Sequence, residues 1–214
     1  MALPQSELIF TEEEYLAFER ASAERHEYLD GHIYLMAGES DEHGDISMNL
    51  SGILYAQLRG KPCRARAKDL KVRSGPRPRN PRFPGGLYSY PDLVVICGEP
   101  QYLDSHRDVL INPQVIIEVL SDSTEAFDRG EKFRRYRQWL PSLTDYLVVA
   151  QNRPLIEHFA RNAEGQWVIA ASVTELTDRL RIASVDCTLP LNEVYDRSEF
   201  PPDEQEAEAF ENEE

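Results

Sequence analysis

Apolar residues recur at helical spacing in three stretches of the chain, which predicts three helices. The first begins after Thr11, where Glu14 stands three residues later and completes a capping box. The second spans residues 41–59 and is followed by Gly60, a residue typical of the position just beyond a helix C-terminus. The third spans residues 124–140, and its apolar stripe consists of Phe133, Tyr136, Trp139 and Leu140.

Short apolar or alternating runs predict strands around these helices. Two alternating segments flank Asp30-Gly31, a dipeptide typical of a two-residue hairpin turn. The run CRARAKDLKVRS, residues 63–74, alternates as one strand would. Further strands are predicted in PDLVVIC, QVIIEVLS, DYLVVA, LIEHFAR and QWVIAAS, the last two forming a hairpin. Because a strand, a helix and a strand follow one another over residues 114–150, we expect an α/β fold with a mixed sheet flanked by helices.

Length and composition are typical of one globular domain with an acidic tail. Of the 214 residues, 41% are hydrophobic, which is enough for a core. We expect residues 1–200 to form a single domain. Residues 201–214 have too few apolar groups to offset their ordering entropy and are expected to be disordered.

The sequence shows no pattern typical of a targeting signal, a disulfide framework or a zinc cluster. No apolar run approaches the roughly 20 residues that span a bilayer, and the N-terminus lacks the pattern of a secretory signal, so we expect no membrane association and a cytoplasmic location. Cys63, Cys97 and Cys187 are far apart, odd in number and not in CxxC pairs. This pattern argues against both a disulfide framework and a zinc cluster.

The charge distribution bears on the kind of partner. A formal net charge of −15 is unfavourable for binding nucleic acid. However, 15 of the 23 Lys and Arg residues lie in residues 59–82 and 129–137. An acidic protein with concentrated basic patches can still bind phosphates locally. The alternative is that these residues form an ordinary solvated face.

Glu118 has the most unusual position of any ionisable residue. It lies within VIIEVL, a strand apolar on both faces, where a lone carboxylate costs on the order of several kcal/mol. Such a group is normally paired, protonated or bound to a metal. Asp92 opens another apolar strand, so neighbouring strands would bring both acids into one pocket. Two hard oxygen ligands suit Mg²⁺ or Mn²⁺. The alternative is that Asp92 caps a turn and Glu118 pairs with a core arginine.

Three further residues are candidates for the same site. Lys132, on the helix after Glu118, would stabilise the charge that develops on a scissile phosphate, or else it is a surface lysine. His43 would donate to a phosphate or shuttle a proton, or else it is a partly exposed cap. Glu27 would be a third acid, or one member of a strand-end salt bridge.

Other catalytic templates fit the sequence poorly. There is no GxxxxGK[ST] loop, no GxGxxG after a strand and no G-x-S-x-G elbow. No two histidines stand four residues apart, which argues against zinc hydrolase chemistry.

These residues, in this order, resemble the Uma-type family of restriction-endonuclease-like proteins within the PD-(D/E)XK nuclease superfamily. The likeness covers roughly residues 10–159 and is carried by HEYLDGHIYLMAGES, PDLVVI, VIIEVLSDST and DRGEKFRRYRQWLPSLTDYLVV. It implies a restriction-endonuclease-like core.

The resemblance also assigns roles to individual residues. Asp92 matches the first acid and Glu118 the second, with the carbonyl of Val119 as a further metal ligand. In the usual superfamily pattern, the lysine follows the second acid by two positions, and Leu120 stands at that position here. Lys132 instead matches the lysine that this family carries on the following helix. Glu27 and His43 match the N-terminal acid and histidine. The segment from Gly75 to Gly86 resembles an insertion or lengthened loop.

The sequence therefore favours a Mg²⁺- or Mn²⁺-dependent endonuclease that hydrolyses DNA. Arginines of residues 64–82, with Arg134 and Arg135, would contact the DNA backbone. A homodimer is expected, because cutting both strands often uses two sites related by a two-fold axis. The alternatives are a non-cleaving nucleic-acid-binding or regulatory protein that keeps the nuclease fold, and an oligomeric scaffold whose acidic tail binds a basic partner.

Overall fold

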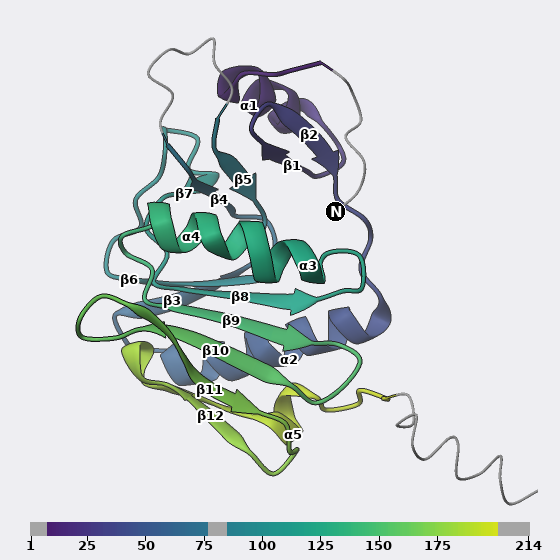
Figure 1. Ribbon diagram of the computed structural model, residues 1–214, viewed down its shortest axis with the longest axis vertical. Helices are drawn as coiled ribbons and strands as arrows, with labels where there is room; N and C mark the ends of the chain where they lie inside the picture. The colour runs from purple at the N-terminus through teal and green to yellow at the C-terminus, as the bar shows by residue number, and fades with distance from the viewer. Residues whose placement is uncertain (1–7, 77–84, 201–214) are drawn as a thin grey trace, which may run out of the picture.

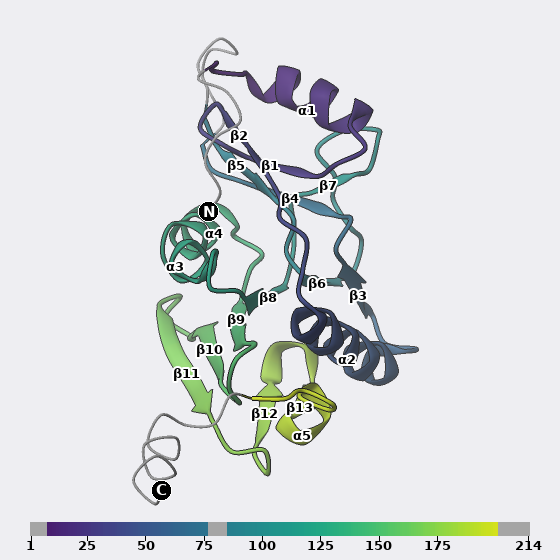
Figure 2. The ribbon, with the colours of Figure 1, turned by 90° about the vertical axis from the view of Figure 1, so that its right-hand side faces the viewer.

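The computed structural model of the protein describes residues 8–76 and 85–200, which form a six-stranded sheet, a five-stranded sheet and a two-stranded sheet of β12 and β13, with helices packed against them (Figure 1, Figure 2). The fold is mixed α/β, as the sequence predicts. Most of the Pro/Arg-rich segment and the acidic tail, whose disorder was expected, lie outside the described residues. Within the described ranges, no helix is long and apolar enough to cross a membrane.

The largest sheet has six strands in the order β11-β10-β9-β8-β6-β3. The central strands β8 and β9 are parallel, and the third predicted helix connects them, which confirms the strand–helix–strand unit. The other neighbouring pairs are antiparallel. The strands are β3 (Cys63–Ala67), β6 (Leu93–Cys97), β8 (Val115–Leu120), β9 (Asp145–Ala150), β10 (Ile156–Arg161) and β11 (Trp167–Val173).

Helices cover both faces of this sheet (Figure 2). One face packs against α2 (Asp41–Leu58), which begins at the N-cap Ser40 and ends just before Gly60, whose φ is +80°. The other face packs against a helical segment made of α3 (Glu125–Phe127), a π-helical turn η1 (Asp128–Lys132) and α4 (Phe133–Trp139). The predicted helices over residues 41–59 and 124–140 are therefore confirmed.

The five-stranded sheet lies at the N-terminal end of the molecule and carries α1 (Glu12–Ala21) (Figure 1). The capping box of Thr11 and Glu14 is present, and Asp30 and Gly31 turn the β1–β2 hairpin with φ of 46° and 97°. Both local predictions are confirmed. In the order β2-β1-β5-β4-β7, the strands are β1 (His26–Leu29), β2 (His32–Leu35), β4 (Lys71–Ser74), β5 (Leu87–Ser89) and β7 (Val109–Leu110).

The C-terminal elements were not predicted from the pattern. They are β12 (Arg179–Ile182), the 3₁₀ turn η2 (Ala183–Val185), β13 (Cys187–Pro190) and α5 (Leu191–Val194). Each is four residues or shorter, which is too short for a periodic signal. Their apolar side chains nevertheless belong to the core beneath α2.

Two predictions about the pattern are wrong. Residues 63–74 form two strands in different sheets, because the chain turns at Lys68, where φ is 52°. Trp139 does not share the buried stripe of the third helix, since it is 41% exposed whereas Leu140 is buried. The last helical turn ends at Trp139, and the chain leaves the helix with Leu140 turned into the core.

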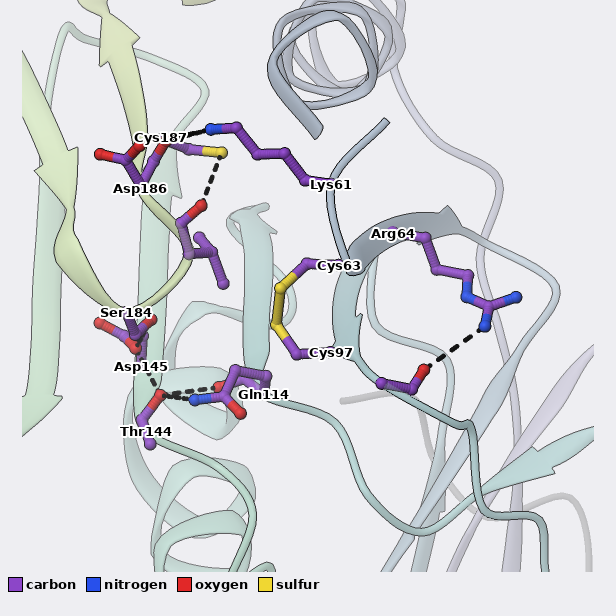
Figure 3. Close-up of a disulfide and its surroundings, with 12 residues drawn as sticks. Lys61, Cys63, Arg64, Cys97, Gln114, Thr144, Asp145, Ser184, Asp186 and Cys187 are labelled. Atoms are coloured by element: carbon purple, nitrogen blue, oxygen red, sulfur yellow. Dashed lines mark hydrogen bonds and ion pairs between the residues drawn. A yellow bond between two sulfur atoms is a disulfide. The ribbon is translucent and has the colours of Figure 1, made fainter. Parts of the chain in front are cut away.

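The argument against a disulfide is also wrong. Cys63 and Cys97 form one, with Cα atoms 4.0 Å apart (Figure 3). The two residues face each other across the antiparallel pair β3–β6. Their separation of 34 residues in sequence conceals this contact, because strand pairing rather than a CxxC spacing brings them together. Cys187 is free and buried.

We predict that Cys63→Ser lowers the free energy of unfolding by about 3–4 kcal/mol, because the bond closes a long loop and restricts the unfolded chain. Urea unfolding with and without reductant measures the effect. Reductant should destabilise the native sequence but leave Cys63→Ser unchanged, and adding Cys97→Ser should cost little more. If reductant does not change the unfolding curve of the native chain, the disulfide is absent.

Candidate functional site

The alternation of β8 decides which way Glu118 points. Ile116 and Leu120 belong to the core on the α4 side of the sheet, whereas Ile117 and Val119 belong to the core on the α2 side. Because successive side chains of a strand face opposite sides, Glu118 lies on the α4 side. It is 3% exposed, so its carboxylate is removed from solvent.

Lys132 reaches Glu118 from the π-helical turn. Its Nζ lies 2.8 Å from Asp128 Oδ1, 3.2 Å from Glu118 Oε1 and 3.4 Å from Glu27 Oε1. Lys132 is 5% exposed, so it is not a surface lysine. π-helical turns inside helices often occur at functional sites. Asp128 and Lys132 stand four residues apart in this turn, and both are buried.

Asp92 lies where the pairing of β6 with β8 stops. The last paired residues are Leu93 and Ile117, and just beyond them Asp92 Oδ2 accepts a hydrogen bond of 2.7 Å from the backbone N–H of Val119. Asp92 Oδ1 lies 2.8 Å from His43 Nε2 on the first turn of α2. Both oxygens of this carboxylate are therefore held in place.

The predicted residues converge in one cavity of about 660 Å³. Its lining includes all six of them: Glu27, His43, Asp92, Glu118, Val119 and Lys132. They come from β1, α2, the start of β6, β8 and η1.

Sequence reasoning missed two residues of this cluster. Asp128, in contact with Lys132, is 3% exposed, and its spacing of four residues from Lys132 is the signal that could have found it. The hydroxyl of Tyr136 donates to Glu118 Oε1 at 3.2 Å and lies 2.7 Å from Ser89 Oγ. Tyr136 was interpreted as an apolar core residue, and nothing in the pattern distinguishes these roles.

Burial and repulsion shape the electrostatics of the cluster. Desolvation raises the pKa of Glu118 well above its ordinary range, and the charges of Asp128, Asp92 and Glu27 raise it further, against the lowering effect of Lys132. Desolvation likewise raises the pKa of Glu27. Negative charge thus exceeds positive charge around Glu118, which is the condition that attracts a cation.

Lys132 shows the opposite balance. Burial alone would lower its pKa, but the charges of Asp128, Glu118 and Glu27 hold it well above the ordinary range. The ammonium group therefore stays protonated at neutral pH. It can stabilise negative charge but cannot act as a base.

The donors available to a metal are few. No three His, Cys, Asp or Glu side chains of the described ranges are arranged to hold one ion. Asp92 and Glu118 offer two carboxylates, and Asp92 is close enough to raise the pKa of Glu118. Two hard oxygen donors with an excess of negative charge fit Mg²⁺, which usually takes one or two carboxylates and keeps several waters.

Two of the arginines expected to contact DNA have other partners. Arg73 is 7% exposed, and its guanidinium binds Glu12 at 2.7 Å. Arg135 is 7% exposed and pairs with Asp30 and Glu131. These two arginines stabilise the fold and are not free to bind phosphates. Arg64 and Arg66, on the edge strand β3, are exposed.

The fold is that of a nuclease-like α/β protein. It matches the crystal structure of a protein from Anabaena variabilis, described as "a putative nuclease belonging to DUF820", with a TM-score of 0.68 and 14% identity over 87% of this chain and 97% of that one. This likeness shows the fold alone.

The chain belongs to the Uma2 family, described as "Putative restriction endonuclease", whose model matches residues 12–192. Two uncharacterized Synechocystis proteins are similar to it. One, slr1290, is 37% identical over 86% of this chain and 90% of its own length. The other, sll1609, is 31% identical over 78% of this chain and 89% of its own length.

We predict that Glu118→Gln stabilises the fold at neutral pH by on the order of 1 kcal/mol, as neutralising a strained functional group often does. A carboxyl whose pKa is raised on folding destabilises the fold as pH rises above its ordinary value of 4.5. The gain should therefore be present at pH 7 and vanish by about pH 4. Urea unfolding across this pH range measures it.

Glu131→Gln is the matched control for this prediction. Hydrogen bonds, first with Arg134 and then with Arg135, lower the pKa of Glu131 to about 2. Its charge stabilises the fold above its ordinary value of 4.5, and this contribution is lost as pH falls toward 2. Glu131→Gln should therefore destabilise the fold at pH 7. The same sign for both variants would contradict the electrostatic assignment.

Proposed function

We propose that this protein is a metal-dependent phosphodiesterase that hydrolyses DNA. The observation that carries the proposal is the convergence of Asp92, Glu118 and Lys132 in one cavity from three distant segments of the chain. Membership of the Uma2 family supports hydrolysis of a phosphodiester bond.

Asp92 and Glu118 would hold the divalent cation, with the backbone carbonyl of Val119 as a third protein ligand. The excess of carboxylate charge around Glu118 supports this assignment, because a divalent cation would offset it. When bound, Mg²⁺ or Mn²⁺ neutralises phosphate charge and lowers the pKa of a water molecule.

Lys132 would stabilise the negative charge that develops on the phosphate in the transition state. Its contact with Asp128 supports this role in two ways. The contact keeps the ammonium protonated, and it holds the side chain toward Glu118.

His43 and Glu27 would be accessory groups. The bond from His43 Nε2 to Asp92 Oδ1 supports a positioning role, since it orients the carboxylate that faces the cation. Glu27 shares Lys132 with Glu118 at 3.4 Å and would help to hold its ammonium in the cavity.

The DNA backbone would lie across the exposed arginines of β3. Arg64 and Arg66 are on the edge of the six-stranded sheet, and phosphate contacts of this kind position a duplex without reading its sequence. The net charge of −15 makes such binding dependent on a few local contacts, and therefore weak at high salt.

One observation favours a second function, that of a non-cleaving nucleic-acid-binding or regulatory protein. Both oxygens of Asp92 already accept hydrogen bonds, from Val119 and His43, so a cation would share this carboxylate with two donors. A protein of this kind would bind DNA in a salt-dependent way without cutting it.

We expect Mg²⁺-dependent cleavage of DNA that Glu118→Gln reduces by at least about 100-fold, because the variant loses a charged metal ligand. Linear, supercoiled and single-stranded DNA should be assayed with Mg²⁺ and with Mn²⁺. Glu131→Gln, in the helical turn that carries Lys132 but outside the cavity lining, should retain activity. Native-level activity in Glu118→Gln, or none in the native chain with either metal, would refute the proposal.

Metal binding can be tested apart from activity. Crystals soaked in Mn²⁺ should show anomalous density between Asp92 and Glu118, and crystals of Glu118→Gln should lose it. Density elsewhere, or equal density in both proteins, would contradict the ligand assignment. Density without cleavage would favour the regulatory function.

A further inference from the structure

The outer face of α2 carries an exposed apolar stripe. Met48 is 71% exposed and Tyr55 is 68% exposed. Gly52 lies between Met48 and Tyr55 on the same face, and Ala56 lies beside Tyr55. Both are also exposed. Figure 2 shows α2 on the outside of the molecule, with the strands on its inner side.

Among the described residues, none packs closely against Gly52. A β-carbon added there would meet no heavy atom within 4 Å, so no neighbour requires its absence. Glycine is also among the least favourable residues in a helix interior. A glycine on an exposed helix face does, however, allow the backbone of a second helix to approach closely.

The charges at the two ends of the stripe are self-complementary. Asp45 and Arg59 are exposed, and no ion pair is present at either of them within the described ranges. Asp45 stands seven residues before Gly52 on the same face of α2, and Arg59, the C-cap of the helix, stands seven residues after it. Met48 and Ala56 each stand four residues from it. A second copy of α2, antiparallel and related by a two-fold axis at Gly52, would therefore place Asp45 beside Arg59 and Met48 against Ala56.

We infer that the chain forms a symmetric homodimer through the outer face of α2, with the two-fold axis at Gly52. Each Asp45 pairs with Arg59 of the other copy, so the interface has two ion pairs at its ends and an apolar centre. Such self-complementarity is what a two-fold contact requires, because the same patch must fit itself.

The interface would also set the distance between the candidate sites of the two copies. His43 lies nine residues before Gly52 on the same helix, so the two His43 residues would stand about 27 Å apart along the paired helices at 1.5 Å per residue. The dimer does not depend on the proposed nuclease activity, and either can fail alone.

Charge reversal tests the pairing. Sedimentation of the full chain over a range of concentrations should show a dimer. Asp45→Arg and Arg59→Asp should each weaken dimerisation at least tenfold, and the double variant should restore it to within about threefold, since the charges are exchanged. Glu164→Arg, the same charge change on the β10–β11 turn, should have no effect. A monomer at every concentration, or a double variant no better than the singles, would overturn the inference.

Crosslinking tests the register and does not depend on the stability of the charge variants. Gly52→Cys should form an interchain disulfide on mild oxidation, because residue 52 meets itself. Ala56→Cys should not do so alone, but should crosslink when mixed with Met48→Cys. The native chain is a clean background, since Cys187 is buried and the other two cysteines are paired. Failure of Gly52→Cys to crosslink would exclude this axis, and crosslinking of Ala56→Cys alone would exclude this register.

Discussion

The ammonium group of Lys132 makes the arrangement around Glu118 possible. A buried carboxylate is tolerated only when it is protonated, paired or bound to a cation, and Lys132 is in contact with three carboxylates at once. This contact joins η1 to β8 and β1, which are distant in sequence. The same ion pairs leave negative charge uncompensated. The cluster is therefore stable enough to fold and still attractive to a divalent cation.

The sheet supplies the geometry that this interaction needs. β8 lies between β6 and β9, and its pairing with β6 ends one residue before Glu118. That early end leaves room for the Asp92 side chain, which bonds the next free backbone N–H of β8. The parallel crossover from β8 to β9 then brings the helical segment back over the face that Glu118 occupies. An acid, a second acid and a lysine meet at one point because strand pairing stops there.

α2 connects the candidate site with the surface of the molecule. Its inner face packs on the sheet, its first turn holds His43 against Asp92, and its outer face carries the self-complementary stripe. One rigid helix thus positions a residue of the site and presents an interface. A change in the packing of α2 would therefore displace both His43 and the outer stripe, because side chains on one rigid helix move together.

The sequence by itself determined the local elements and the candidate acids. Period and capping are local properties, so the helices, the Asp30-Gly31 hairpin and the oddity of Glu118 could be read directly. Only the tertiary structure decided which side chains meet. The partner of Cys63, the break at Lys68 and the contact of Tyr136 with Glu118 depend on strand order and on how the helical segment packs against the sheet. These are set by packing between distant segments, which leaves no periodic trace in the chain.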